Sequence, residues 1–252
     1  MMEVYWLERT EADLPTDNDW LSASEAASLN GMRFAKRRDD WRLGRWTAKR
    51  AVATYLILPS DRQILAGIEI RPMPSGAPEV FIANQPAAVT VSLTHRAGAA
   101  ACAIASSGVA LGCDLEVIEP RSEAFIADYF TAEEQQLIQR MSATERPRLL
   151  ALLWSGKESA LKALRTGLRL DTRSVTVRLP QGESNGWTKD PALAFLSHDH
   201  SGWRPLLAVC EGGQIFHGWW QITSSLLRTV VASPPPLAPI SLDTTVPVQS
   251  AS

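Results

Sequence analysis

Residues 112–116 read GCDLE, and residues 154–162 read WSGKESALK. In the first stretch two carboxylates are two residues apart in an apolar run, so a β-strand would direct both from one face. In the second stretch Glu158 and Lys162 are four residues apart, which places them on one face of a helix. Carboxylates beside an ammonium group are suited to holding Mg²⁺ against a phosphate. We therefore hypothesise a metal site formed by three carboxylates: Asp114, Glu116 and Glu158.

Each stretch also has an ordinary structural explanation. A strand with one solvated polar face is common in antiparallel sheets. A glutamate and a lysine four residues apart can be a simple surface ion pair, which adds only about 0.2–0.5 kcal/mol to a helix. Taken separately, neither stretch identifies a function.

The composition excludes several classes of protein. The 252 residues carry 25 basic and 27 acidic side chains, a net charge of −2, so a broad nucleic-acid-binding surface is not expected. The three cysteines are far apart in apolar runs, which favours a reducing compartment over a disulfide framework. No signal peptide or membrane-spanning run is recognisable, so we expect a soluble, cytoplasmic protein without a membrane partner.

A basic segment over residues 33–50 stands out from the nearly neutral chain. Its cations recur every three or four residues, which places four of them on one helix face: Arg38, Arg42, Arg45 and Lys49. This face can bind a small polyanion or can simply be solvated, and the spacing leaves both alternatives open.

The predicted elements form two similar sets, with the pattern restarting after Gly108. Each set has one long helix, over residues 34–58 or 146–164, and several short strands, including 64–70, 89–93, 99–105, 109–117 and 174–179. We therefore expect an α+β fold of two subdomains, residues 1–109 and 110–232. The Pro-rich remainder, residues 233–252, is expected to be a disordered tail.

Taken in chain order, these motifs resemble 4′-phosphopantetheinyl transferases of the surfactin-synthetase-activating type. The signatures of that family are a Gly-x-Asp-x-Glu strand and a Trp-Ser-x-Lys-Glu-(Ser/Ala)-x-x-Lys helix, matched by residues 112–116 and 154–162. Upstream matches are SLTH at residues 92–95, GAP at 76–78 and Gly-Arg at 44–45. Basic residues common just before the Arg-rich helix of the family are missing here.

The resemblance implies two pseudo-twofold-related halves, each a small antiparallel sheet with a long helix, and an active site in the cleft between them. It implies an enzyme of the holo-[acyl-carrier-protein] synthase type that acts as a monomer. The enzyme would move the 4′-phosphopantetheine arm of coenzyme A to a serine of an apo acyl or peptidyl carrier protein, releasing 3′,5′-ADP. Fatty acid, polyketide and nonribosomal peptide synthases contain such carriers, and the sequence does not choose among them.

The resemblance also implies roles for individual residues. Asp114, Glu116 and Glu158 would hold Mg²⁺, with Glu158 acting as metal ligand, as base toward the serine hydroxyl, or as both. Lys162 and His95 would be catalytic together with Glu158 and would contact the phosphates. Coenzyme A would contact a set of polar residues: Arg38, Arg42, Arg45, Thr94, His95, Lys157 and Lys162. Glu134 belongs to a capping-box pattern, for which a structural role is favoured. Two rival interpretations are a non-catalytic module that binds coenzyme A or carrier proteins, and a metal-dependent phosphodiesterase.

Overall fold

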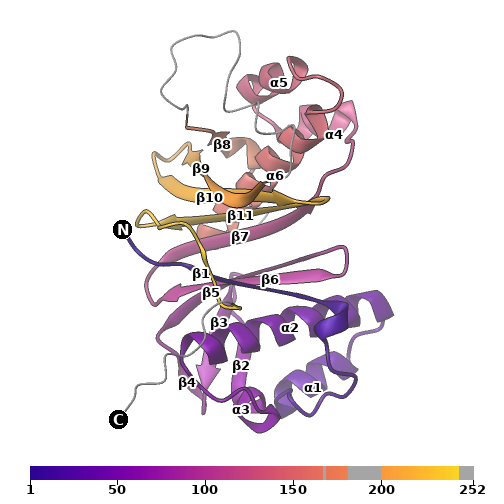
Figure 1. The fold of residues 1–252 in the computed structure, drawn as a ribbon, viewed down its shortest axis with the longest axis vertical. Coiled ribbons are helices and arrows are strands. Elements are labelled where there is room, and N and C mark those ends of the chain that lie inside the picture. The colour runs from indigo at the N-terminus through magenta and orange to yellow at the C-terminus, as the bar shows by residue number, and fades with distance from the viewer. Residues whose placement is uncertain (167–168, 181–199, 244–252) are drawn as a thin grey trace. The chain divides into compact units, whose positions relative to one another are not determined.

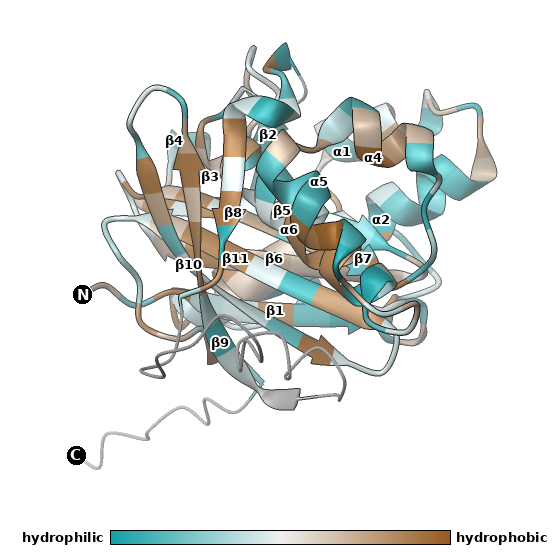
Figure 2. Ribbon diagram, turned by 90° about the horizontal axis from the view of Figure 1, so that it is seen from above, coloured by the Kyte–Doolittle hydropathy of each residue, from teal (hydrophilic) through white to brown (hydrophobic). Residues whose placement is uncertain are grey.

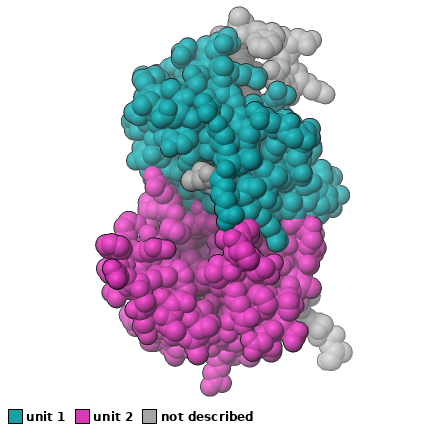
Figure 3. Space-filling model, turned by 180° about the vertical axis from the view of Figure 1, so that it is seen from behind, with its two compact units in different colours: residues 1–2, 110–238 teal, residues 3–109, 239–252 magenta. Residues whose placement is uncertain are grey.

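The computed structural model describes residues 1–166, 169–180 and 200–243. The chain divides into two compact units, which are coloured separately in Figure 3. Unit 1 comprises residues 1–2 and 110–238, and unit 2 comprises residues 3–109 and 239–252. Each unit has its own hydrophobic core. No helix in the described ranges has both the length and the apolar character needed to cross a membrane.

Unit 2 packs one long helix, α2 (Ala35–Tyr55), against a four-stranded sheet (Figure 1). The strand order is β12-β1-β6-β5, with bounds Ile240–Ser241, Tyr5–Thr10, Ala99–Ser106 and Val89–Arg96. A second sheet, β2-β3-β4, comprises Ile68–Pro72, Pro78–Ile82 and Gln85–Pro86. Two shorter helices, α1 and α3, span Ala23–Asn30 and Arg62–Gly67.

Unit 1 packs a second long helix, α6 (Arg146–Ala163), against a five-stranded sheet. The strand order is β7-β11-β10-β9-β8, with bounds Ala110–Val117, Leu226–Ser233, Ile215–Thr223, His200–Cys210 and Val175–Arg178. Two further helices, α4 and α5, span Glu123–Tyr129 and Ala132–Gln139. Every neighbouring pair of strands in this sheet is antiparallel.

The predicted α+β fold is confirmed, because each unit has one long helix on a mainly antiparallel sheet.

The two long helices differ in hydropathy (Figure 2). The beginning of α2 is hydrophilic, whereas α6 carries the apolar run 149–153, whose five side chains are buried in the core of unit 1. Burial of such apolar surface is the main favourable contribution to folding.

Two local predictions are wrong. The run predicted as a strand over 64–70 begins as helix α3, because the side chain of Asp61 accepts a hydrogen bond from the amide of Ile64 and caps the helix. The predicted tail is ordered as far as residue 243, since strand β12 pairs in parallel with β1. Residues 244–252 lie outside the described residues.

A buried glutamate–lysine pair lies at the beginning of α1 in unit 2. Lys49 of α2 is inaccessible to solvent, and its Nζ lies 2.5 Å from Glu25 Oε2. The same carboxylate closes the capping box of α1 with Ser22 and accepts a hydrogen bond from the amide of Ile70 in β2. Lys49 therefore belongs to the core and not to a solvated basic face.

Unit 1 contains a second pair of the same kind. Lys157 of α6 is also inaccessible, and its Nζ lies 2.8 Å from Glu134 Oε2. Glu134 closes the capping box of α5 with Thr131 and accepts a hydrogen bond from the amide of Val177 in β8. Glu134 therefore has the structural role that the capping-box pattern favoured.

Gly112 marks the closest approach of β7 to α6. A Cβ atom at this position would lie 1.8 Å from the carbonyl oxygen of Ser159 and 2.8 Å from the amide nitrogen of Ala163. The helix beside it is also fixed by hydroxyl contacts, since Thr229 Oγ1 of β11 lies 2.7 Å from Ser159 Oγ and 2.8 Å from Ser155 Oγ. Only glycine lets the strand and the helix meet at this distance.

We therefore expect Gly112→Ala to destabilise unit 1 by about 3 kcal/mol or more, because overlap with backbone atoms cannot be relieved by a side-chain rotation. Gly202→Ala is the matched control, since its Cβ would meet nothing within 4 Å. Urea unfolding of both variants measures the difference. Equal midpoints for the two variants would show that β7 and α6 are not packed as described.

Candidate functional site

Strand β7 and helix α6 bring together the residues predicted for the metal site. Lys162 Nζ lies 2.8 Å from Asp114 Oδ1 and donates a second hydrogen bond, of 2.9 Å, to the carbonyl of Cys113. Glu158, one helical turn before Lys162, is close enough to Asp114, Lys162 and Glu116 for their charges to affect its pKa. The polar face of the strand and the polar face of the helix therefore meet within unit 1.

The surroundings of the cluster favour the protonated forms of Glu158 and Lys162. Burial raises the pKa of Glu158 above its usual value, and the carboxylate of Asp114 adds to the effect more than Glu116 does, while Lys162 opposes it. For Lys162, burial lowers the pKa, but the charge of Asp114, the hydrogen bond to it and the charges of Cys113 and Glu158 together outweigh burial, so the pKa is raised. The cluster thus holds an excess of negative charge in a partly desolvated place.

The donor chemistry of this cluster fits a divalent cation. Three carboxylates are hard oxygen donors, and a cation would offset the repulsion that raises the pKa of Glu158. In the described part of the chain, however, no three side chains of His, Cys, Asp or Glu stand in the arrangement of a metal site. Two of the three carboxylates instead form ion pairs within the protein. Lys162 Nζ lies 2.8 Å from Asp114 Oδ1, and Arg121 Nη2 lies 2.8 Å from Glu116 Oε1. The contact from Arg121 was not predicted, because the sequence gives no regular spacing between these residues.

The structure places Lys157, for which a contact with coenzyme A was predicted, in the core of unit 1. Its side chain is fully buried, and besides Glu134 it donates to the backbone carbonyls of Thr172 and Val175. All of its hydrogen-bonding capacity is used inside unit 1. Lys157 directly precedes Glu158, but one residue turns a helix by about 100°, so the lysine points into the core.

Unit 2 contains a cavity of about 620 Å³ between the beginning of α2 and the end of β5. Thr94 and His95, predicted from the SLTH motif, line it from β5. The α2 side is lined by aromatic and charged residues that include Phe34, Lys36, Arg37, Asp40, Trp41 and Arg45. A cavity of this size that mixes apolar walls with a few polar groups is typical of a small-molecule site.

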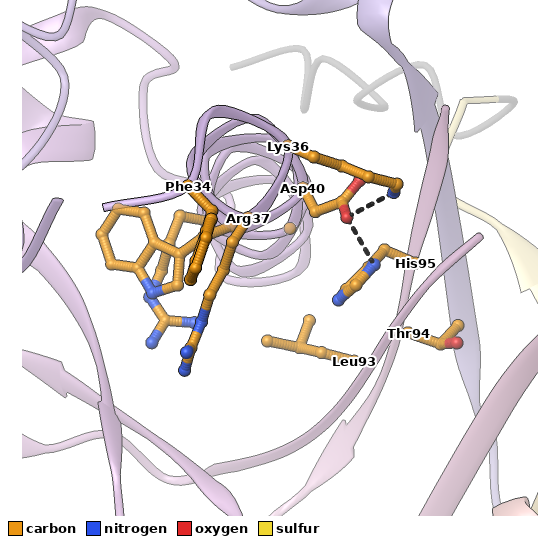
Figure 4. A pocket seen from close by; sticks show the side chains of 10 residues that line it. Phe34, Lys36, Arg37, Asp40, Leu93, Thr94 and His95 are labelled. Carbon is orange, nitrogen blue, oxygen red and sulfur yellow. Dashed lines mark hydrogen bonds and ion pairs between the residues drawn. The ribbon is translucent and has the colours of Figure 1, made fainter. Parts of the chain in front are cut away.

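One end of the cavity gathers a histidine, a carboxylate and an ammonium group (Figure 4). Asp40 Oδ2 accepts a hydrogen bond of 2.8 Å from Lys36 Nζ and lies 3.9 Å from His95 Nδ1. His95 remains accessible, with 53% of its side chain exposed. A protonated imidazole or an ammonium group at this place can donate to a phosphate oxygen.

The three arginines of α2 for which contacts with coenzyme A were predicted lie in different surroundings. Arg45 lines the cavity with its guanidinium 4.8 Å above the ring of Trp41, and burial lowers its pKa. Arg42 instead donates to Asn18 Oδ1 and to the carbonyl of Pro15, both at 2.8 Å, so it holds the loop before α1. Arg38 is exposed and is not among the cavity-lining residues. The cavity thus brings Arg45 together with Thr94 and His95 but does not include Arg38 or Arg42.

Comparison with known proteins adds one finding. Residues 110–208 match the family model of the 4′-phosphopantetheinyl transferase superfamily. The matched stretch begins at the first residue of β7 and contains both the GCDLE and the WSGKESALK motifs. A comparison with curated proteins gives no match. The chain is thus similar to this superfamily over most of unit 1.

Proposed function

We propose that this protein transfers the 4′-phosphopantetheine arm of coenzyme A to a serine hydroxyl of an apo carrier protein, with Mg²⁺, and releases 3′,5′-ADP. The observation that carries the proposal is the cluster of Asp114, Glu158 and Lys162 inside the stretch that matches the transferase superfamily. Three carboxylates with one ammonium suit a reaction at a diphosphate, where charge must be neutralised on both reacting oxygens.

In this proposal Asp114, Glu116 and Glu158 hold the magnesium ion, which when bound neutralises charge on the diphosphate oxygens. Lys162 donates a hydrogen bond to Asp114, and its ammonium would supply a further positive charge to the diphosphate. Arg121 keeps the carboxylate of Glu116 oriented through their 2.8 Å contact. These side chains would together bind the diphosphate and position the phosphorus attached to the pantetheine arm.

Glu158 is the proposed base. The oxygen of the carrier serine attacks the phosphorus of the phosphopantetheine group. The bond between this phosphorus and the bridging oxygen of the diphosphate breaks, and 3′,5′-ADP leaves. The serine proton passes to the carboxylate of Glu158, the member of the cluster on α6 one turn before Lys162. The same residue can also be a metal ligand, because a carboxylate has two oxygens.

The cavity of unit 2 would take the nucleotide part of coenzyme A. Thr94 and His95 offer hydrogen-bond donors to phosphate oxygens, and Arg45 with Trp41 offers a charged, planar surface for the base or the ribose phosphate. This assignment is supported by the size and charge of the cavity and by the SLTH motif of β5.

The proposed function predicts that the purified protein modifies a carrier protein. We expect incubation with coenzyme A, Mg²⁺ and a panel of apo carriers from fatty acid, polyketide and nonribosomal peptide synthases to add one phosphopantetheinyl arm to at least one carrier. Intact-protein mass spectrometry detects the gain, and the product 3′,5′-ADP is measured in the same sample. Omitting Mg²⁺ and adding EDTA should prevent both.

The same experiment separates the rival interpretation. A non-catalytic module would bind coenzyme A in calorimetry but leave every carrier unmodified, with or without Mg²⁺. Binding without modification on the whole panel would therefore contradict the proposed enzyme.

A further inference from the structure

Arg121 lies between β7 and α4, in contact with the carboxylate cluster of unit 1. Its Nη2 is 2.8 Å from Glu116 Oε1 and 3.1 Å from Glu119 Oε1. Glu116 is buried, whereas the side chain of Glu119 is 42% exposed. Charges attract each other more strongly in a partly desolvated place than in water, so Glu116 is the stronger partner of this guanidinium.

An aromatic ring also holds Arg121 in place. Its guanidinium carbon lies 5.2 Å from the ring centre of Phe125, and this ring in turn contacts the ring of Trp154 at 5.1 Å between centres. A guanidinium stacked on an aromatic face is attracted to that face, and its planar shape is pre-organised for pairing with a carboxylate. Arg121 is therefore a fixed counter-charge of Glu116.

The three carboxylates of the cluster differ in how far their charge is compensated. Asp114 is paired with Lys162 at 2.8 Å, as Glu116 is with Arg121. Glu158 forms no hydrogen bond or ion pair with any other residue that the structure describes. One carboxylate of the three is thus left without a close counter-charge in the free protein.

A divalent cation requires more negative charge than one carboxylate supplies. Mg²⁺ gives up its water reluctantly, and proteins usually bind it through one or two carboxylates together with phosphate oxygens of a substrate. The diphosphate of coenzyme A brings such oxygens, whereas the free protein offers mainly the charge of Glu158. As long as Arg121 compensates Glu116, firm binding of the ion therefore depends on the diphosphate.

We propose that Arg121 is a positioning residue that acts through Glu116. By compensating this carboxylate it keeps the affinity of the free protein for Mg²⁺ low, and it makes firm binding of the ion depend on coenzyme A. The inference deepens the proposed function and rests on it. It gives a role to an arginine that lies in neither the GCDLE nor the WSGKESALK motif.

Removing the guanidinium has two opposite effects on the metal site. Glu116 loses a contact that orients it, which weakens metal binding, but its full charge becomes available to the ion. The second effect is the larger one, because a guanidinium repels a divalent cation strongly in a partly desolvated place, whereas a carboxylate reorients by a simple rotation of its side chain. Arg121→Gln should therefore bind Mg²⁺ more tightly than the wild type.

Calorimetric titration with Mg²⁺, in the absence and presence of coenzyme A, measures this effect. Arg121→Gln should lower the dissociation constant of the free protein for Mg²⁺ by about tenfold or more and reduce its dependence on coenzyme A. Arg121→Lys keeps the charge and should bind the ion as weakly as the wild type. Arg146→Gln is the matched control, because Arg146 forms a 2.6 Å ion pair with Glu123, whose side chain is 77% exposed.

Thermal unfolding provides an independent measurement. Without its counter-charge the buried Glu116 destabilises the folded protein, so Mg²⁺ should raise the melting temperature of Arg121→Gln more than that of the wild type. Adding Glu116→Gln to Arg121→Gln should abolish this extra stabilisation. If Arg121→Gln is unfolded without metal, recovery of its circular dichroism on addition of Mg²⁺ is measured instead, and a lack of recovery would overturn the inference.

The outcomes distinguish this inference from the proposed function. Unchanged or weaker Mg²⁺ binding by Arg121→Gln, tighter binding by Arg121→Lys, or a wild type whose Mg²⁺ binding does not depend on coenzyme A would overturn the role of Arg121. If the titrations agree with the inference but no carrier is modified, the proposed function fails, and the role of Arg121 in metal binding stands.

Discussion

Glu158→Gln is expected to lower kcat/KM for carrier modification by about 10²–10⁴-fold, the usual effect of losing a general base. The amide keeps the shape of the side chain but can neither accept the serine proton nor supply a full negative charge to Mg²⁺. Activity is measured from the rate of 3′,5′-ADP release at saturating coenzyme A. Glu133→Gln, which changes a 73% exposed glutamate in the same unit, is the control and should retain full activity.

The same variant should be more stable than the wild type at neutral pH when no metal is present. Burial and neighbouring carboxylates raise the pKa of Glu158 in the folded protein above its unfolded value. A raised carboxyl pKa contributes stability below the unfolded pKa, and that contribution is lost as the pH rises through the folded pKa. Glutamine removes this pH dependence.

Thermal unfolding of both proteins in EDTA between pH 4 and pH 8 measures the effect. We expect the melting temperatures to be similar at the acid end of this range and the variant to melt higher at the neutral end. A wild type that is the more stable protein at neutral pH would show that the carboxylate of Glu158 is well solvated or paired, and the argument for its role as a base would lose its support.

Lys157→Met should have the largest effect on stability. Removing the ammonium leaves the carboxylate of Glu134 buried without a counter-charge, which typically costs about 3–5 kcal/mol. For a chain of this size we expect the melting temperature to fall on the order of 10 °C. Lys36→Met is the control, because Lys36 is 84% exposed and its ion pair with Asp40 contributes little.

A double variant sharpens this prediction. Adding Glu134→Gln to Lys157→Met removes the uncompensated charge while keeping an oxygen that can accept from the amide of Val177. Part of the lost stability should therefore return. If Lys157→Met unfolds at the wild-type temperature and raises only the KM for coenzyme A, Lys157 is a ligand-binding residue after all.

Local patterns in the sequence predicted the parts of the fold that depend on neighbouring residues. The long helix α2 was predicted from basic residues with helical spacing in a run that ends before Pro59, and β7 because its polar residues alternate with apolar ones. The same two periods, 2 for the strand and 3.6 for the helix, place Asp114 and Glu158 on the polar face of their own element. That the strand and the helix meet was expected from the resemblance to a known family.

Features that depend on distant partners could not be predicted in this way. The contact of Lys157 with Glu134 was not predicted because the two lie on different helices, and that of Arg42 because its acceptors lie in a loop before α1. Strand β12 was missed because it pairs with β1 at the opposite end of the chain. Arg37 belongs to the same basic run as Arg38, and only the position of the cavity separates the two.

The two buried glutamate–lysine pairs are built in the same way. In each unit a glutamate closes a capping box, accepts from a strand amide and neutralises a buried lysine of the long helix. Each pair therefore connects three elements of its unit: the short helix that the glutamate caps, the strand that donates to it and the long helix that carries the lysine. A substitution at either partner should thus loosen all three elements together and not the long helix alone.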